Sequence, residues 1–232
     1  MPGRYAERID GMGAAPSRAT PGERGPTTIM TTASAIMATL GLKRHPTCGY
    51  VQETYRSRHS LPAPSLPEGY EGPRPVGSAL YFMVTADAHI VMHRIRSDQI
   101  YHHYLGDPLQ VLLLYPDGTG EVRVVGPDLE AGMRPQLFIP GGTFHMSRLE
   151  HTKGFALLGS SEWIGVEPPD VELGDFEDLS RRYPATRDVM MDFMASAGPP
   201  SGPLREALRH REAMLDEALQ ETFPGSDTPS IT

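Results

Sequence analysis

The chain is poor in cysteine and has no cluster of basic residues. Its 232 residues include a single cysteine, Cys48, so no disulfide can form within the chain, and this fits a reducing compartment. The formal net charge is −8 and no long basic run occurs. Because phosphate binding needs clustered Lys and Arg, we do not expect nucleic acid as the main partner.

Long hydrophobic runs and several common binding motifs are also missing. No apolar run approaches the length of a membrane span, and the polar beginning of the chain lacks the apolar core of a signal peptide. There is no Gly-x-Gly-x-x-Gly, P-loop, Gly-x-Ser-x-Gly or CxxC pattern. We therefore expect a soluble cytoplasmic protein with no membrane partner and no nucleotide or flavin cofactor.

Turn-forming residues, in contrast, are abundant. The chain has 24 Gly and 23 Pro, which favour short strands and many turns. Turns such as 116–118 (Pro-Asp-Gly) suit hairpins, and their regular spacing predicts an all-β barrel or sandwich. The predicted strands are 50–55, 79–84, 90–95, 99–105, 110–115, 121–125, 136–139, 144–148 and 155–159.

Helices are predicted on both sides of this β region. Apolar residues recur at near-helical spacing over 28–42, with Gly41 placed as a C-cap. Segments 175–183 and 187–195 form a predicted helical pair, and 203–222 is a charged amphipathic helix that is either a dimer contact or a solvated appendage. The predicted division is a disordered tail over 1–27, a barrel domain with its N-terminal helix over 28–184, and a helical extension over 185–232.

Many short motifs in a fixed order carry a resemblance to a known family. They are 54–57, 78–82, 93–94, 97–102, 106–109, 126–129, 134–136 and 139–142. This order, from about residue 36 to 184, resembles the cupin superfamily, and within it a bacterial and fungal branch catalogued as a domain of unknown function. The resemblance implies a cupin-type double-stranded β-helix, or jelly-roll barrel, with flanking helices, and a homodimer.

The chain departs from the cupin pattern at important positions. The pattern has two histidines separated by one residue, then a glutamate seven residues before a glycine, and later Pro-x-Gly-x-x-His. His93 matches the first histidine, but Ile95 occupies the place of the second. Gln99 stands where the glutamate is expected, and His145 completes the later motif, although the branch generally lacks that histidine. Relative to the branch, the site has lost a carboxylate and gained an imidazole.

Side-chain alternation along the strands predicts a metal site. Gln99 and His103 share one face of their strand, and His102 lies on the other, although which of the two histidines faces the cavity stays open. Together with His93 and His145, the predicted ligands His93, Gln99, His103 and His145 suit Zn²⁺, Ni²⁺, Fe²⁺ or Mn²⁺. A metal-free polar pocket remains the alternative, since Gln99 replaces the one anionic ligand.

Further residues are candidates for binding or catalysis. Glu162 is a candidate general base near the barrel mouth, with a surface carboxylate as the alternative. Arg56 would anchor a carboxylate or phosphate, or form a structural ion pair. The predicted substrate-binding residues are Glu53, Tyr55, Arg56, Tyr81, Gln99 and Trp163. The predicted catalytic residues are His93, Tyr101, His103, His145 and Glu162.

These residues favour a small-molecule enzyme that moves a proton next to a carbonyl group. Histidine is a base near neutral pH, and a metal or Tyr hydroxyl stabilises the developing enolate. An isomerase, epimerase, cyclase or lyase, in a biosynthetic pathway, is therefore predicted. The alternatives are a non-catalytic cupin that binds a sugar, nucleotide or other small ligand, a metal-dependent oxygenase, and a structural homodimer with a vestigial cavity.

Overall fold

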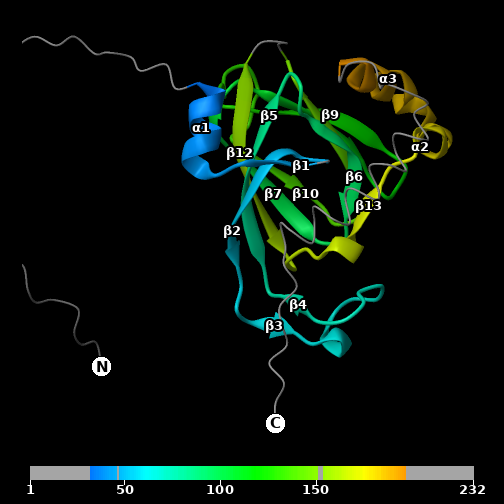
Figure 1. The fold of residues 1–232 in the computed structure, drawn as a ribbon. Coiled ribbons are helices and arrows are strands. Elements are labelled where there is room, and N and C mark those ends of the chain that lie inside the picture. The colour runs from blue at the N-terminus through cyan, green and yellow to red at the C-terminus, as the bar shows by residue number, and fades with distance from the viewer. Residues whose placement is uncertain (1–31, 46, 151–153, 197–232) are drawn as a thin grey trace, which may run out of the picture. The chain divides into compact units, whose positions relative to one another are not determined.

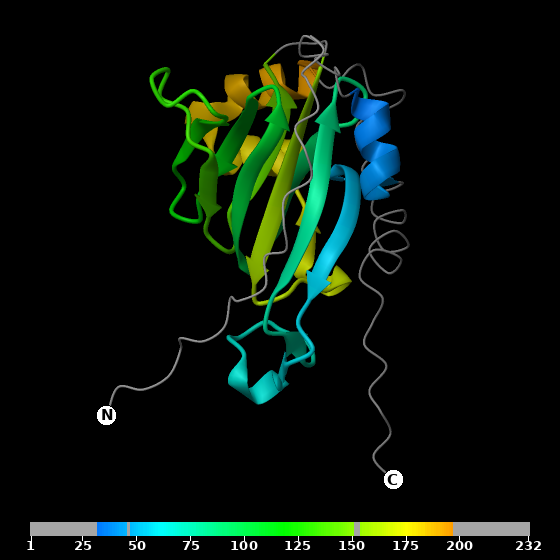
Figure 2. The ribbon, with the colours of Figure 1, turned by 90° about the vertical axis from the view of Figure 1, so that its left-hand side faces the viewer.

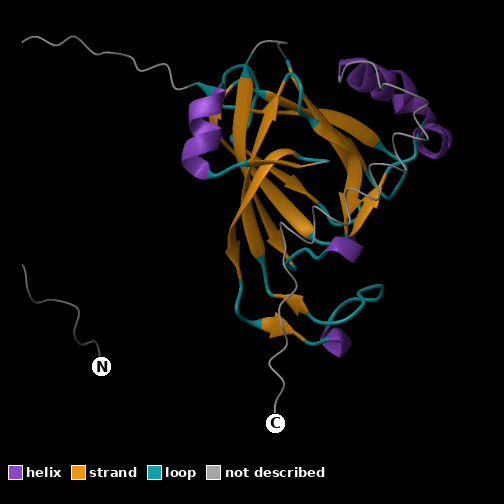
Figure 3. Ribbon diagram, in the orientation of Figure 1, coloured by secondary structure: helices purple, strands orange, loops and turns teal. Residues whose placement is uncertain are grey.

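The computed structural model describes residues 32–45, 47–150 and 154–196. Two antiparallel sheets form most of this region and curve around a common interior (Figures 1 and 3). The predicted tail over 1–27 and the predicted helix over 203–222 lie outside the described residues. No helix in the described part of the chain is long and apolar enough to cross a membrane.

The larger sheet has six strands. Their order is β1 (Lys43–His45), β2 (Gly49–Arg56), β5 (Ser78–Thr85), β12 (Phe155–Trp163), β7 (Asp98–Gly106) and β10 (Gln136–Ile139). Neighbours along this order pair antiparallel although many are far apart in sequence, as Figure 2 shows for the long strands. These crossovers are typical of a jelly roll.

The second sheet has five strands and faces the first. Their order is β13 (Val171–Leu173), β6 (Ile90–Ile95), β11 (Phe144–Leu149), β8 (Leu109–Leu114) and β9 (Gly120–Val125). A separate two-stranded sheet pairs β3 (Ser60–Leu61) with β4 (Arg74–Pro75). All strands predicted between residues 50 and 159 are present, and the all-β prediction is confirmed. The short strands β1, β3, β4 and β13 were not predicted.

The main core fills the space between the two sheets. Inward-facing residues of both sheets are fully buried there, for example Phe82, Val111, Leu113 and Leu158. Each alternates with outward-facing neighbours, as the period of two along a strand requires. Some of these core residues, Phe82 among them, also line a cavity.

Helices cover parts of the outer faces. Helix α1 (Ala33–Leu40) has Thr32 as its N-cap, whose side chain accepts a hydrogen bond from Ala35 N, and Gly41 as its C-cap, with a left-handed φ of 68°. Gly41 is therefore the predicted C-cap. Within the described residues this helix begins at Ala33, and it packs Ile36 against Met83 on the outer face of the larger sheet.

Two further helices lie against the five-stranded sheet (Figure 1). They are α2 (Phe176–Arg182) and α3 (Arg187–Ser196), which match the predicted pair. Leu179 of α2 and Phe193 of α3 pack with Leu112 and Phe144 of the sheet. Short 3₁₀ turns complete the described elements: η1 (Ala63–Ser65), η2 (Pro168–Asp170) and η3 (Pro184–Thr186).

Candidate functional site

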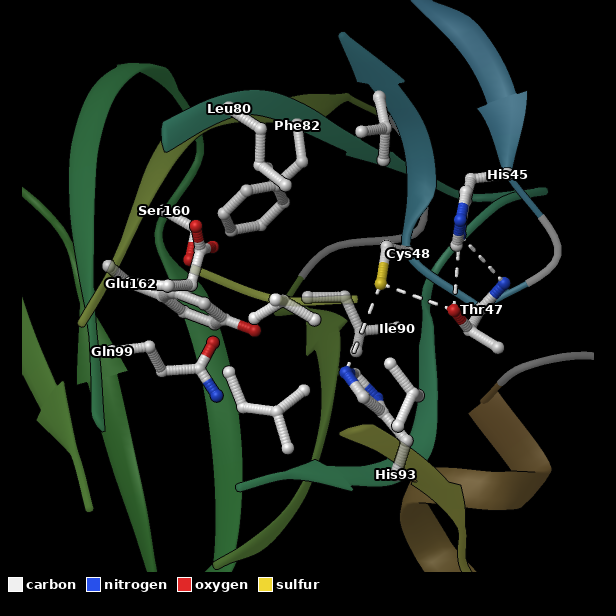
Figure 4. Close-up of a pocket in the computed structure, with 15 residues that line it drawn as sticks. His45, Thr47, Cys48, Leu80, Phe82, Ile90, His93, Gln99, Ser160 and Glu162 are labelled. Carbon is white, nitrogen blue, oxygen red and sulfur yellow. Dashed lines mark hydrogen bonds between the residues drawn. The ribbon is translucent and has the colours of Figure 1, made fainter. Parts of the chain in front are cut away.

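A cavity of about 50 Å³ lies inside the barrel, between the two sheets (Figure 4). Its lining residues come from β1, β2, β5, β6, β7, β12 and β13 and from the turns beside them. They are His45, Thr47, Cys48, Val51, Leu80, Phe82, Ile90, His93, Ile95, Gln99, Tyr101, Ser160, Glu162, Val166 and Val171. Most of the wall is apolar, and the polar groups converge from a few strands.

Glu162 supplies a buried carboxyl group. It is only 3% exposed and lies on β12, directly opposite Gln99 of β7 and Ser78 of β5 in the strand register. Ser78 Oγ donates a hydrogen bond of 2.8 Å to Glu162 Oε2. Burial raises the pKa of Glu162 to about 7, although the hydroxyl groups of Ser160 and Ser78 oppose this. The carboxyl is therefore ready to gain or lose a proton near neutral pH.

Gln99 extends its amide into the cavity from the neighbouring strand β7 of the same sheet (Figure 4). The residue is 4% exposed, and its Nε2 atom has no hydrogen-bond partner among the described residues. Buried amide groups are normally hydrogen-bonded, because an unpaired one loses its bonds to water without replacement. Gln99 thus presents an unsatisfied N–H group at the cavity.

Tyr101, in the cavity wall, and His145, behind it, form a hydrogen-bonded pair. Tyr101 Oη and His145 Nε2 are 2.9 Å apart, and His145 Nδ1 lies 3.2 Å from Thr143 O. The carbonyl can only accept, so His145 Nδ1 donates to it. Burial, then the nearby His93, lower the pKa of His145 well below its usual value, so its Nε2 carries no proton. Tyr101 therefore donates its hydroxyl proton to His145.

His93 lies beside this pair and contacts Cys48. Its ring centroid is 4.4 Å from that of His145, and its Nδ1 donates to Val91 O over 2.9 Å. His93 Nε2 faces Cys48 Sγ at 3.9 Å. Burial lowers the pKa of His93 and raises that of Cys48 to about 11, so both groups are uncharged near neutral pH.

The turn between β1 and β2 closes this side of the cavity. Val91 N of β6 donates to Thr47 O, and Cys48 forms an isolated bridge with Ile90, so the turn is attached to the second sheet. His45 Nδ1 contacts the Thr47 hydroxyl at 3.1 Å. Burial, together with the nearby His93, lowers the pKa of His45 to about 4, so its imidazole is neutral near neutral pH, like those of His93 and His145.

Comparison with known proteins identifies the family. Residues 34–173 match a family model described as Cupin superfamily (DUF985), which is more than half of the chain. The chain belongs to the cupin superfamily. Its resemblance to that superfamily is thereby confirmed, as is the cupin-type barrel with flanking helices.

This cupin is similar to proteins from distant organisms. A hypothetical protein from Leishmania major has a TM-score of 0.63 and 26% identity, over 70% of this chain and 98% of that one. Protein SO0799 from Shewanella oneidensis has a TM-score of 0.61 and 27% identity, over 71% and 98%. The uncharacterized protein YML079W from Saccharomyces cerevisiae is 30% identical over 125 residues, which are 50% of this chain and 62% of the yeast protein.

The four predicted metal ligands do not come together in this cupin. No group of three or more His, Cys, Asp or Glu residues that could hold a metal ion occurs among the described residues. His103 lies four residues beyond Gln99 on β7, about 13 Å along the strand, and its Nε2 donates to Asp107 O instead. His145 already uses Nε2 to accept from Tyr101. The predicted set therefore does not fit a resident divalent cation, and metal binding stays a prediction.

Of the predicted catalytic residues, three line the cavity. They are His93, Tyr101 and Glu162, and the carboxyl of Glu162 is not on the surface. His145 is buried directly behind Tyr101 and is not part of the lining. His103 is not part of the lining, because it lies four residues beyond Gln99 along β7. Alternation gives the face of a strand on which a residue lies, but not its position along the barrel.

Of the predicted substrate-binding residues, only Gln99 lines the cavity. Tyr55 and Trp163 are 57% and 52% exposed. Arg56 pairs with Glu53 at 3.0 Å and with Glu167 at 2.6 Å, so the structural ion pair is the correct alternative.

Tyr81 also lies away from the cavity. Its ring makes an edge contact with Tyr104 at a centroid distance of 5.8 Å and packs near α1. Leu80 and Phe82, on either side of it along β5, line the cavity instead. Tyr81 therefore faces the outside of the sheet.

Several lining residues were missed by reasoning from sequence. Ser160 lies two residues before Glu162 on the same strand, so alternation would have predicted it once that strand was extended beyond residue 159. His45, Thr47 and Cys48 lie at a strand too short to show any periodicity. Their place at the cavity depends on the pairing of their turn with β6.

Proposed function

We propose that this cupin is a small-molecule enzyme in which Glu162 moves a proton at a carbon atom next to a carbonyl group of the substrate. The observation that carries the proposal is the position of Glu162, buried in the lining of an apolar cavity and paired in register with Gln99 on the neighbouring strand. Isomerases, epimerases, cyclases and lyases all use such a proton transfer.

The environment of Glu162 suits a group that acts in both directions. A general acid–base works best when its pKa is close to the working pH, and burial brings the pKa of Glu162 to about 7. The ionised carboxylate removes the proton from the α-carbon, and the electron pair moves onto the carbonyl oxygen. Return of the proton to the opposite face of the same carbon inverts it, and in an unsaturated carbonyl compound its return to the γ-carbon of the dienolate shifts the carbon–carbon double bond. Either step restores the carboxylate.

Tyr101 and the two histidines have different roles from those that the sequence suggested. Burial raises the pKa of Tyr101 well above its usual value, so the hydroxyl stays protonated. Its proton is directed at His145 Nε2, and its oxygen is free to accept a hydrogen bond from a substrate hydroxyl. His145 is a positioning residue for Tyr101. His93 faces Cys48 with an unprotonated Nε2.

Exchange of α-protons in D₂O tests this proposal without knowledge of the natural substrate. Proton NMR would follow loss of the α-proton signals of 2-butanone, cyclopentanone and dihydroxyacetone with the wild-type protein and with Glu162→Gln. We expect exchange above the buffer rate that rises through pH 7, and a reduction of about a hundredfold or more in the variant. Glu130→Gln, at an exposed glutamate, is the matched control and should exchange as fast as the wild type.

Two results would overturn the proposal. One is exchange in Glu162→Gln as fast as in the wild type, and the other is no exchange of any of the three probes above the buffer rate. The same assay tests metal assistance. We expect exchange to survive dialysis against a chelator, because the predicted ligands are not assembled. Loss of exchange that Zn²⁺, Ni²⁺, Fe²⁺ or Mn²⁺ restores would contradict a site that depends on Glu162 alone.

A further inference from the structure

The unsatisfied amide of Gln99 marks a place for one atom of a ligand. Its Nε2 is buried, extends into the cavity and has no partner among the described residues (Figure 4). A buried N–H group without an acceptor destabilises the folded state, and an oxygen atom that accepts its hydrogen bond removes that free-energy cost. Tyr101 cannot supply the same bond, because its proton is donated to His145. Gln99 is thus a hydrogen-bond donor that the cavity offers to a carbonyl oxygen, and Ser160, whose buried Oγ also has no hydrogen-bond partner among the described residues, is a second hydroxyl in the lining.

The cavity offers no positive charge to a ligand. None of the described residues that line it is Lys or Arg. The imidazole of His93 donates Nδ1 to a backbone carbonyl and turns Nε2 toward a thiol, which is the bonding pattern of the neutral form. The Arg56 guanidinium is held by the carboxylates of Glu53 and Glu167.

An anionic ligand would therefore meet only one charge in the cavity, that of Glu162. Two carboxylates in an apolar space repel each other, and each also loses its hydration. A neutral carbonyl compound carries neither cost. The apolar walls, which include Leu80, Phe82 and Ile90, favour its hydrocarbon part.

The volume of the cavity limits the size of the part that it encloses. It measures about 50 Å³, and a water molecule needs roughly 10–15 Å³ by the same measure. About four non-hydrogen atoms therefore fit without rearrangement of the walls. A carbonyl group with its neighbouring carbons has this size.

We infer that the cavity binds small uncharged carbonyl compounds, that is ketones, aldehydes or amides, through a hydrogen bond from Gln99 Nε2 to the carbonyl oxygen. It excludes carboxylates and phosphates of the same size. This inference rests on the proposed function, since it names the class of compound on which Glu162 acts. Binding of the carbonyl oxygen by Gln99 does not require turnover, so it can be measured separately from proton exchange.

A pair of isosteric probes tests the inference directly. Propionamide and propionate have the same shape, and only propionate is charged at pH 8. Titration of the full-length protein with each probe, and with 2-butanone, would be followed by NMR shifts of the protein at constant ionic strength. We expect propionamide and 2-butanone to bind at least tenfold more tightly than propionate.

Substitution of Gln99 tests the hydrogen bond. Gln99→Met keeps the length of the side chain and removes the N–H donor, so we expect about tenfold weaker binding of 2-butanone. Gln99→Glu keeps a polar side chain of the same size and should weaken binding of 2-butanone as well, which covers the case that Gln99→Met fails to fold. Gln136→Met, at an exposed glutamine, is the control and should bind as the wild type does.

Equal affinity for propionamide and propionate, or unchanged binding of 2-butanone in both Gln99 variants, would overturn the inference. Its failure is distinguishable from that of the proposed function. Binding of 2-butanone that depends on Gln99, without α-proton exchange, would contradict only the proposed enzymatic function. Exchange that depends on Glu162 but not on Gln99 would contradict only the proposed binding of the carbonyl oxygen by Gln99.

Discussion

Replacement of Glu162 by glutamine should change how the stability of the protein depends on pH. Glutamine has nearly the same shape and can still accept the hydrogen bond from Ser78 Oγ. In the wild type, the folded state holds the Glu162 proton up to a pKa of about 7, whereas the unfolded state releases it near the ordinary value of 4.5. Between these two values only the folded state holds the proton.

The size of the effect follows from that difference. Each pH unit over which only the folded state holds the proton lowers the free energy of unfolding by about 1.4 kcal/mol. The stabilisation by the protonated carboxyl is complete below pH 4.5 and is lost as the pH rises through 7. The wild type should therefore lose about 3 kcal/mol relative to Glu162→Gln between pH 4.5 and pH 8.

Other buried groups make the comparison with the variant necessary. The pKa values of His45, His93 and His145 are lowered, so these residues add stability above their ordinary pKa that is lost as the pH falls. Their contribution has the opposite sign to that of Glu162. Because both proteins contain all three histidines, the difference between the two stability curves removes most of this contribution.

Urea denaturation followed by circular dichroism at pH 4.5, 6, 7 and 8 measures the difference. We expect Glu162→Gln to gain about 3 kcal/mol on the wild type across this range, with most of the gain complete by pH 7. Glu130→Gln, at an exposed position, should show a constant difference. A constant difference for Glu162→Gln as well would refute the claim that burial raises the pKa of this carboxyl, and with it the acid–base role.

Two further predictions concern the frame around the site. Asp170→Asn leaves the buried Arg74, 2.7 Å away, without its carboxylate and should cost about 3–5 kcal/mol in urea denaturation, whereas Glu172→Gln at an exposed ion pair should cost under about 1 kcal/mol. Equal costs would contradict this reading. Phe193→Ala should cost about 3–5 kcal/mol by the same assay, because α3 packs on the barrel, and the exposed Met191→Ala about 0.5 kcal/mol or less. A small loss for Phe193→Ala would show that α3 is dispensable.

The strands and turns of this protein were predictable because they depend on local chemistry. Gly41 ends α1 with a left-handed φ, and the Pro116-Asp117-Gly118 turn joins β8 to β9 with a positive φ at Gly118. The regular spacing of such turns marked the strands of the jelly roll. Short strands such as β1 and β13 carry too few residues for a period, so only their pairing partners reveal them.

The order of the motifs and the residue types at the site were also readable from the sequence. His93, Gln99 and Tyr101 line the cavity on the strand faces that alternation predicted, and Glu162 lines it beyond the end of the predicted strand. His103 does not, because a strand rises about 3.3 Å per residue and carries it away from the cavity. Alternation tells on which face of a strand a side chain lies, and only the packed barrel shows how far along the barrel it lies.

By itself, the sequence determined that this chain forms a cupin barrel with neither the motifs of a nucleotide site nor the paired histidines of the common cupin pattern. Tertiary structure alone decided which groups at the site have shifted pKa values. Burial between two sheets gives Glu162 a pKa near 7, and it keeps the three histidines neutral, although nothing in their sequence neighbours indicates either effect. The physical reason is that a pKa depends on the water and charges around a group, and these come from strands far apart in the chain.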